Sequence, residues 1–211
     1  MTSHETGNLV STCVTDASTR SYAQKTLPPN TPDKPYFWYP MYVRYCQELS
    51  VQKALESNAF RTFIPMERYD IKRGHKIITE TRPAIHNLIF VWSFRERITW
   101  MKMYNRDCLP MQYMSRPLMD GGSEVITVPE KAMDNIIRAA TVDDPDGQRS
   151  YIERDLDISD LDKSIQFIDG SFKGVKGVIK RVDNNRVMII PVANNVNMKI
   201  VIARASDIEY I

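Results

Sequence analysis

Several kinds of signal are missing from this chain of 211 residues, and each absence narrows its possible functions. No stretch approaches 18 consecutive uncharged apolar residues, so we expect no membrane span. The first 30 residues are polar and lack the apolar segment of a secretory signal, which favours a cytoplasmic location. The three cysteines, Cys13, Cys46 and Cys108, are scattered and odd in number, so we expect reduced thiols rather than disulfides.

Motifs of catalysis and metal binding are missing as well. The histidines, His4, His75 and His86, show no H-x-x-x-H spacing and the cysteines no C-x-x-C spacing, so we expect no metal site. No G-x-S-x-G nucleophile motif occurs. With no motif around them, Cys46 and Cys108 are expected to be buried small hydrophobes. The sequence therefore predicts no catalytic residue, no cofactor and no enzyme activity.

The distribution of charge indicates two folded parts separated by an acidic strip. Residues 35–140 carry 15 basic and 11 acidic side chains, residues 141–160 carry 2 and 7, and residues 161–211 carry 8 and 5. Residues 1–34 are polar, and the stretch "LPPNTPDKP" at 27–35 stops any helix at their end. We therefore predict a disordered arm at 1–34, a domain at 35–140, a solvated linker at 141–160 and a second domain at 161–211.

Residues 35–140 alternate between strand and helix patterns, as in an α+β domain. "YFWYPMYVRY" is strand-like, although Pro40 suggests an edge strand or a kink. "ELSVQKALESNAF" has apolar residues near helical spacing, among them Leu49, and "IHNLIFVWSF" is a continuous apolar run typical of a buried strand. In "TVPEKAMDNIIRAA", Thr127 and Glu130 fit a capping box that starts a helix.

From Ser164 onward the pattern is entirely that of β structure, with five short strands separated by Gly, Asn and Asp turns. We predict a small closed barrel, because closure removes exposed strand edges. The strand-favouring residues and Pro191 also argue against this segment refolding into a helical hairpin.

The stretch "FIDGSFKGVKGVIKRV", residues 167–182, allows three interpretations. A phosphate-binding loop would need G-x-x-x-x-G-K-[ST] opening a helix, and here a strand follows instead. Alternatively, Gly170 and Gly174 build a turn, and Gly177 lies where two backbones approach too closely for a Cβ atom. A third possibility adds binding of RNA or protein, for which the candidate solvent-facing cations are Lys173, Lys176, Lys180 and Arg181.

Two segments carry a family resemblance. "SIQFIDGSFKGVKGVIKRVDNNRVMIIPV" resembles the KOW motif, with its glycine at Gly177. "WYPMYVRY", a helix, "FIPMERY", "RPAIHNLIFVW" and "VPEKAMDNI" occur in the order seen in NusG N-terminal domains. Residues 36–211 thus resemble a NusG-family transcription factor. The resemblance is closer to the RfaH and UpxY-type regulators of surface-polysaccharide operons, because Asn87 replaces the glycine of the housekeeping F-P-G-Y sequence.

The resemblance implies an α+β fold, in which a NusG N-terminal-type domain, an antiparallel sheet flanked by helices, precedes an SH3-like all-β KOW barrel. It also implies that the first domain binds the clamp of RNA polymerase through an apolar depression. The residues that would line the depression are Tyr42, Ile85, Leu88 and Phe90. An exposed apolar cluster is often a binding surface. The alternative is that these side chains belong to the core.

The resemblance further implies contacts with non-template DNA or nascent RNA. Arg44 matches a basic family position that faces DNA. A basic hairpin tip is formed by Lys72, Arg73, His75 and Lys76, and the alternative is that this tip is only exposed to solvent and binds nothing. The KOW barrel would bind a ribosomal protein, a termination factor or RNA. The expected function is suppression of pausing or termination, and the alternative is an RNA- or ribosome-binding module acting mainly through the barrel.

Overall fold

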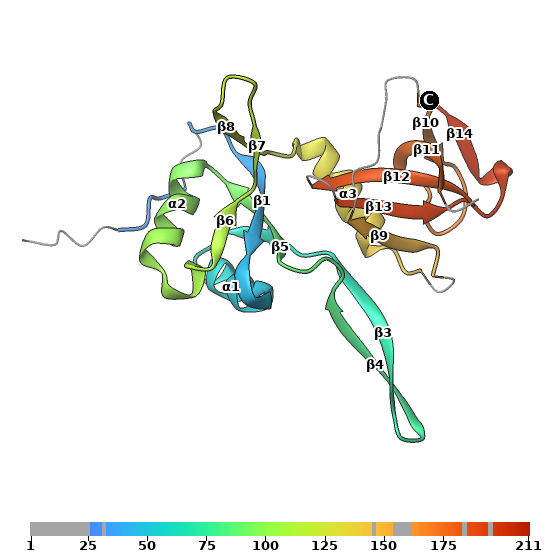
Figure 1. The fold of residues 1–211 in the computed structure, drawn as a ribbon, viewed down its shortest axis with the longest axis horizontal. Helices are drawn as coiled ribbons and strands as arrows, with labels where there is room; N and C mark the ends of the chain where they lie inside the picture. Colours follow the sequence, from blue (N-terminus) through green and yellow to red (C-terminus); the bar gives the residue numbers. More distant parts are fainter. Residues whose placement is uncertain (1–25, 31–32, 145–146, 154–161, 183–184, 194–195) are drawn as a thin grey trace, which may run out of the picture.

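A computed structural model of the chain describes residues 26–30, 33–144, 147–153, 162–182, 185–193 and 196–211. Two sheets form the body of the molecule, and the helix α3 (Glu130–Thr141) lies between them (Figure 1). Most of the predicted N-terminal arm, residues 1–34, lies outside the described residues. None of the helices in the described ranges is long and apolar enough to span a bilayer.

The N-terminal sheet has four strands in the order β2-β5-β1-β6. They are β1 (Phe37–Val43), β2 (Arg61–Phe63), β5 (Leu88–Ser93) and β6 (Met111–Tyr113). Because β1 pairs with both β5 and β6, it is a central strand and not the edge strand that Pro40 suggested. The ladder with β6 covers only Met41–Val43, so the missing N–H of Pro40 falls beyond its end and breaks no ladder hydrogen bond.

Two helices cover one face of this sheet. They are α1 (Glu48–Glu56), which the sequence predicts, and α2 (Arg95–Tyr104). Their buried residues Val51, Leu55, Ile98 and Met101 belong to one apolar cluster with Met41 and Ile89 of the sheet. Leu49 is exposed, contrary to expectation, because it lies about 100° around the helix from the buried Glu48. A short 3-10 turn, η1 (Arg44–Cys46), precedes α1, and another, η2 (Arg106–Cys108), follows α2.

Two hairpins extend from the N-terminal sheet. The longer pairs β3 (Met66–Arg73) with β4 (Lys76–Pro83) and projects away from both sheets (Figure 1). The shorter pairs β7 (Ser115–Pro117) with β8 (Ser123–Val125). The projecting hairpin confirms the hairpin tip expected around residues 72–76. Its turn contains Gly74, whose φ of 64° is a left-handed conformation that glycine adopts without strain.

The helix α3 is also predicted, but it begins differently. Pro129 is its N-cap, and no side-chain hydrogen bond caps the helix. The capping box between Thr127 and Glu130 is therefore not formed. The reason lies in Val128, whose N–H donates to the Trp38 carbonyl of β1 at 2.8 Å and holds this segment extended against the sheet.

The C-terminal sheet has six strands in the order β14-β10-β11-β12-β13-β9. They are β9 (Arg149–Glu153), β10 (Ser164–Phe167), β11 (Lys176–Val182), β12 (Asn185–Ala193), β13 (Val196–Val201) and β14 (Ile208–Tyr210), with the turn η3 (Ala205–Asp207) before the last. The predicted all-β character is confirmed for the described residues. Among the described residues the paired strands run from β14 at one end to β9 at the other, and β9 pairs with β13. The closed barrel stays a prediction. Residues 149–153, expected in the linker, thus form a strand.

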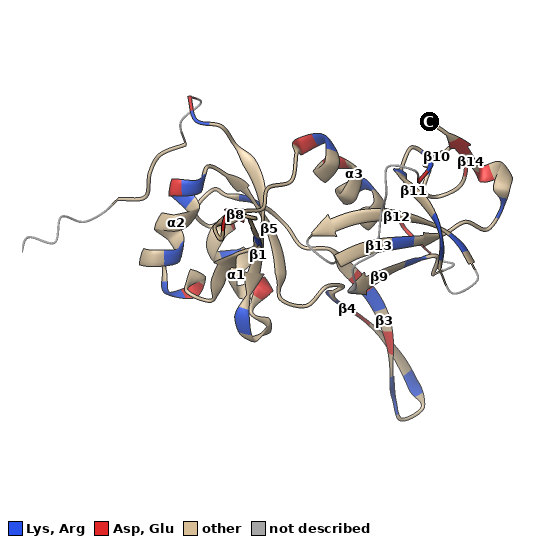
Figure 2. Cartoon of the chain, turned by 45° about the horizontal axis from the view of Figure 1, so that its top comes forward, with Lys and Arg blue, Asp and Glu red and all other residues tan. Residues whose placement is uncertain are grey.

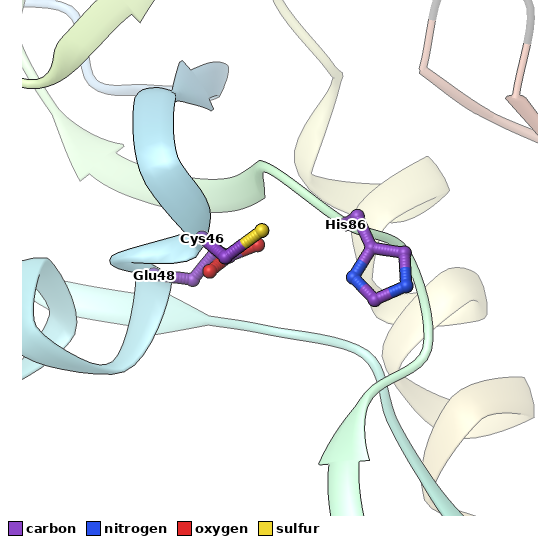
Figure 3. A group of neighbouring side chains, drawn as sticks. All are labelled: Cys46, Glu48 and His86. Atoms are coloured by element: carbon purple, nitrogen blue, oxygen red, sulfur yellow. The ribbon is translucent and has the colours of Figure 1, made fainter.

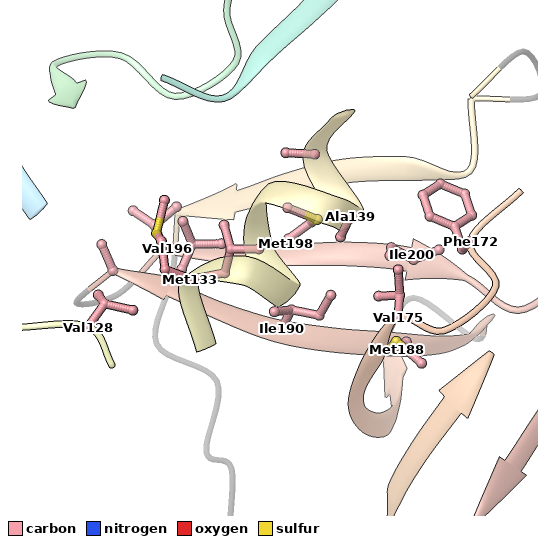
Figure 4. Packing of buried hydrophobic residues seen from close by; sticks show 14 of the residues in the cluster. Val128, Met133, Ala139, Phe172, Val175, Met188, Ile190, Val196, Met198 and Ile200 are labelled. Atoms are coloured by element: carbon pink, nitrogen blue, oxygen red, sulfur yellow. The ribbon is translucent and has the colours of Figure 1, made fainter. Parts of the chain in front are cut away.

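One apolar cluster runs from the N-terminal sheet through α3 to the C-terminal sheet. Its α3 members include Met133, Ile136 and Ala139. Figure 4 shows Met133 and Ala139 of α3 beside Ile190, Met198 and Ile200 of the C-terminal sheet. The Asn135 side chain reinforces this contact, donating to the Lys176 carbonyl at 2.7 Å and accepting from the Lys176 N–H at 2.9 Å. The helix thus packs firmly on the C-terminal sheet.

Candidate functional site

Of the four side chains expected to form an apolar depression, one is exposed and three are buried. Tyr42 and Leu88 lie directly opposite each other on β1 and β5, so they occupy the same face of the sheet. Tyr42 is 42% exposed, whereas Leu88 is 3% exposed, and Ile85 and Phe90 are also buried. In this arrangement only Tyr42 presents a large apolar surface to solvent.

The three buried members of this set are part of the cluster that includes α3. Ile85, Leu88 and Phe90 belong to the same group of contacting side chains as Trp38 and Met133. The ring of Phe90 also lies 6.3 Å from that of Phe63, measured between centroids. Ile85, Leu88 and Phe90 are therefore core residues in this arrangement of the chain, as the alternative interpretation expected.

The segment just after β1 carries two exposed residues suited to binding. Arg44 is exposed, and its guanidinium lies within hydrogen-bonding reach of Gln112, at 2.7 Å once the Gln112 amide is oriented with its oxygen toward the arginine. Tyr45 is 78% exposed and has a left-handed backbone, with φ 65°. Sequence reasoning missed Tyr45, although an aromatic next to the predicted DNA-facing arginine was a usable signal.

The β3–β4 hairpin carries the predicted basic tip. Lys72, Arg73, His75 and Lys76 are all exposed there. Figure 2 shows basic positions at the end of the hairpin formed by β3 and β4. Arg73 is 3.3 Å from the Glu80 carboxylate, so its charge is partly balanced. No ion pair involves Lys72 or Lys76 within the described ranges. These two lysines are therefore the more available cations for a phosphate.

Contacts along the hairpin stiffen it behind the tip. Arg82 donates to Glu67 at 2.8 Å and stacks over the Tyr69 ring, with 4.0 Å from its guanidinium carbon to the ring centroid. On the other face the Thr79 hydroxyl donates to Asp70 at 2.7 Å. The tip thus lies at the end of an arm whose two strands are linked by these side-chain contacts. The structure does not bring it to Arg44, which stays on the body of the domain.

The glycine-rich hairpin of the C-terminal sheet has the predicted turn geometry. Gly170 and Gly174 adopt φ values of 77° and 83°, and the Gly174 N–H donates to the Phe167 carbonyl at 2.7 Å. At Gly177, an added Cβ atom would lie 2.7 Å from the Ile189 carbonyl oxygen and 2.5 Å from Met188 Cγ. The close approach of backbones expected at Gly177 is therefore confirmed.

The cations of this hairpin differ from one another. Lys176 is exposed, whereas the Lys180 ammonium lies 2.7 Å from the Asp162 carboxylate, and its side chain is only 22% exposed. The expectation that Lys180 faces solvent is therefore wrong, because β11 turns it toward the acidic residue that precedes β10. Lys173 and Arg181 are exposed as expected.

A cleft of about 1060 Å³ separates the base of the β3–β4 hairpin from the end of α3, and the sequence gives no hint of it. Its walls include Tyr69, Asp143 and Tyr151. Arg68 reaches across to Asp143 at 3.4 Å. Burial raises the pKa of Tyr151 to about 12, and its buried hydroxyl has no hydrogen-bond partner among the described residues.

The two cysteines of the described residues have different surroundings. Cys108 is buried as expected, and loss of solvent raises the pKa of its thiol to about 12. Cys46 is exposed, which contradicts the expectation of burial, because η1 turns it outward with a left-handed φ of 51°. Cys46 also lies beside Glu48 and His86 (Figure 3). A search for short motifs missed this cluster because His86 is distant in sequence from the other two.

Comparison with known proteins identifies the N-terminal part of the chain. Residues 36–137, which contain the N-terminal sheet, its two hairpins and the start of α3, match the family model NusG, described as transcription termination factor nusG. No curated protein matches the chain. The match covers just under half of the chain. It shows that residues 36–137 are similar to a NusG domain, and it supports a NusG-family factor.

Proposed function

We propose that this chain is a cytoplasmic regulator of transcription elongation, a specialised NusG paralogue of the UpxY or RfaH type. Its N-terminal domain binds the clamp of RNA polymerase and suppresses pausing or termination, on operons for surface polysaccharides. The observation that carries the proposal is the NusG match over residues 36–137, the same residues that fold as the N-terminal sheet with its basic hairpin.

The polymerase-binding surface of this proposal centres on Tyr42, which is already exposed. Ile85, Leu88 and Phe90 complete the surface when the apolar cluster around α3 opens. Binding then selects the open arrangement from an equilibrium between two states, and its apparent affinity is reduced by the fraction of molecules that are closed. The catalytic chemistry stays with the polymerase, because the factor acts only by binding one state of the clamp.

Nucleic-acid contact in this proposal comes from Arg44 and the hairpin tip. Lys72 and Lys76 contribute most because no carboxylate pairs with either in the described structure, and Arg73 contributes less because of Glu80. The partner is the non-template DNA strand or nascent RNA. Contacts of this kind are mainly electrostatic, so they weaken as the salt concentration rises.

The C-terminal sheet acts in this proposal as a KOW domain that recruits a ribosomal protein, a termination factor or RNA. Support comes from Gly177, which lies where the KOW motif has its glycine and where no Cβ atom fits. Lys173, Lys176 and Arg181 are the exposed cations of the hairpin, and Lys180 contributes structure through Asp162.

The assignment to the specialised subgroup rests on Asn87. Its φ of 62° is left-handed, a conformation that glycine and asparagine tolerate better than other residues. Asparagine therefore fits where housekeeping members have glycine. Its side-chain oxygen also accepts a hydrogen bond from the Cys46 N–H at 3.2 Å, which glycine cannot provide.

A binding experiment with core RNA polymerase tests the proposal. The full chain is expected to associate at micromolar concentration, and Tyr42→Ala is expected to weaken this by about tenfold, as for a central aromatic contact. Tyr104→Ala, on α2 at the opposite face of the sheet, is the matched control and should change little. Absence of association, or RNA binding that depends only on the C-terminal sheet, contradicts the proposal and favours the RNA- or ribosome-binding module.

A further inference from the structure

Three potential metal ligands meet at one edge of the N-terminal domain. The Cys46 sulfur, a Glu48 carboxylate oxygen and a His86 ring nitrogen all lie within 4.8 Å of one another (Figure 3). Cys46 ends η1 and Glu48 begins α1, whereas His86 belongs to the turn before β5. The group is therefore created by the fold and not by a local sequence motif.

The backbone fixes the two segments that carry these ligands. The Val43 N–H donates to the Asn87 carbonyl at 2.8 Å, and the Cys46 N–H donates to the Asn87 side-chain oxygen at 3.2 Å. The Asn87 N–H in turn donates to the Glu48 carboxylate. Three hydrogen bonds thus join Asn87, the neighbour of His86, to the segment that carries Cys46 and Glu48. The backbone therefore holds the three ligands close together before a metal binds.

The Glu48 carboxylate lacks a full positive charge nearby. Glu48 is 2% exposed, and no lysine or arginine of the described residues forms an ion pair with it. The first turn of α1 offers it only the partial charge of backbone N–H groups. Burial of an ionised carboxylate is costly unless a cation or several hydrogen bonds compensate. A metal ion between Glu48, Cys46 and His86 would supply that charge.

We propose that Cys46, Glu48 and His86 form a three-ligand site for a divalent transition metal, with Zn²⁺ as the best match. Thiolate, imidazole and carboxylate are its common protein ligands, and a thiolate disfavours Mg²⁺ and Ca²⁺. On binding, the Cys46 thiol releases its proton to solvent and the sulfur bonds to the metal. The exposure of Cys46 and His86 leaves a fourth position for water or a partner's side chain.

The geometry requires only a small adjustment. Ligand atoms about 2.0–2.3 Å from a tetrahedral zinc lie roughly 3.5 Å from one another. The distances between the ligand atoms, which are now up to 4.8 Å, must therefore shorten by about 1 Å. Rotation of the exposed Cys46 and His86 side chains is sufficient for this. Glu48 does not need to move, since Asn87 already holds its carboxylate.

Thermal unfolding of the untagged full chain tests the site, with Zn²⁺ as the probe and Mg²⁺ as the specificity control. Zn²⁺ is expected to raise the unfolding midpoint, because a ligand that binds only the folded state stabilises it. Mg²⁺ at the same concentration should not. Addition of Co²⁺ is expected to produce the near-ultraviolet absorption of a metal–thiolate bond.

Single substitutions assign the effect to the three residues. Cys46→Ser, His86→Ala and Glu48→Gln are each expected to weaken Zn²⁺ binding at least tenfold. Glu48→Gln keeps an oxygen that can accept the hydrogen bond from the Asn87 N–H. This variant therefore tests the loss of the negative charge without the loss of that hydrogen bond. Cys13→Ser and His75→Ala are matched controls that should bind normally. The proposal is overturned if Zn²⁺ leaves the midpoint unchanged, or if the three variants respond as the unsubstituted chain does.

Discussion

At several positions in this chain, the backbone conformation and the space around it explain the residue type as much as the chemistry of the side chain does. Asn87 has a left-handed φ and also receives a hydrogen bond from Cys46. Gly177 has an ordinary φ but no room for a Cβ atom, since β12 runs directly beside it. The sequence indicated the role of Gly177 through its spacing. It could not reveal that Cys46 is exposed, because exposure depends on how η1 turns at the end of β1.

At Gly177 the clash predicts a large effect from a small change. Gly177→Ala is expected to lower the free energy of unfolding by about 2–3 kcal/mol, because the Ile189 carbonyl belongs to the paired strand and cannot move aside cheaply. Gly170→Ala is the control. That site has open space, so only its left-handed φ costs about 1 kcal/mol. Denaturant unfolding measures both, and equal losses would contradict the assigned role.

At the level of elements, helices were the easiest to predict, because periodic apolar residues such as Val51 and Leu55 face one partner surface. Strand neighbours were harder. Pro40 suggested an edge strand, yet β1 is central because the ladder with β6 stops short of the proline. The acidic residues around β9 suggested a linker, yet this strand pairs with β13. Strand pairing depends on which edge is free, and that property is not local to the sequence.

The contact between α3 and β11 gives a prediction at this level. Asn135→Ala is expected to remove both hydrogen bonds to the Lys176 backbone and to destabilise the docked helix by about 1–3 kcal/mol. Asp134→Ala, exposed on the same helix, is the matched control. Hydrogen exchange of the Lys176 amide reports the effect directly. Its rate should rise at least tenfold only in the Asn135 variant, and unchanged exchange would count against this role.

For the whole molecule, the charge distribution predicts two domains, and in the structure one apolar cluster connects the two sheets. The apolar cluster crosses from Trp38 through Met133 to Met198, and the strip expected to separate the domains contains β9. Three of the four expected polymerase contacts are buried within this cluster. Sequence patterns identified these positions as apolar, but whether an apolar residue meets solvent, a neighbouring helix or a partner is decided by the arrangement of the complete chain.

Buried acidic groups with high pKa values predict sensitivity of the whole fold to alkali. The pKa of Cys108 rises from 9.0 to about 12, and those of Tyr113 and Tyr151 rise from 10.0 to about 12, mainly because burial disfavours the anions. The unfolded chain therefore releases these protons first. The stabilisation is complete below about pH 9 and is lost as the pH rises toward 12.

Denaturant unfolding across this pH range checks the prediction. The free energy of unfolding is expected to fall by several kcal/mol between about pH 9 and pH 12, with an upper limit on the order of 1.4 kcal/mol for each unit of pKa difference. Cys108→Ala should flatten the first part of the decline, between about pH 9 and 10. Cys46→Ala, at an exposed thiol, should leave it in place. A profile that is level up to pH 11 would refute the assignment.

The β3–β4 hairpin has a consequence for how molecules of this protein meet one another. Within the described structure, each of its strands pairs only with the other, so both outer edges carry amide and carbonyl groups that could extend a sheet into a second copy. Charged side chains recur along both strands, at Glu67, Arg68, Asp70, Lys72, Arg73, Lys76, Glu80 and Arg82. Pairing of this edge with a second copy would remove water from these charges, which is energetically costly. The hairpin can therefore be long without promoting aggregation.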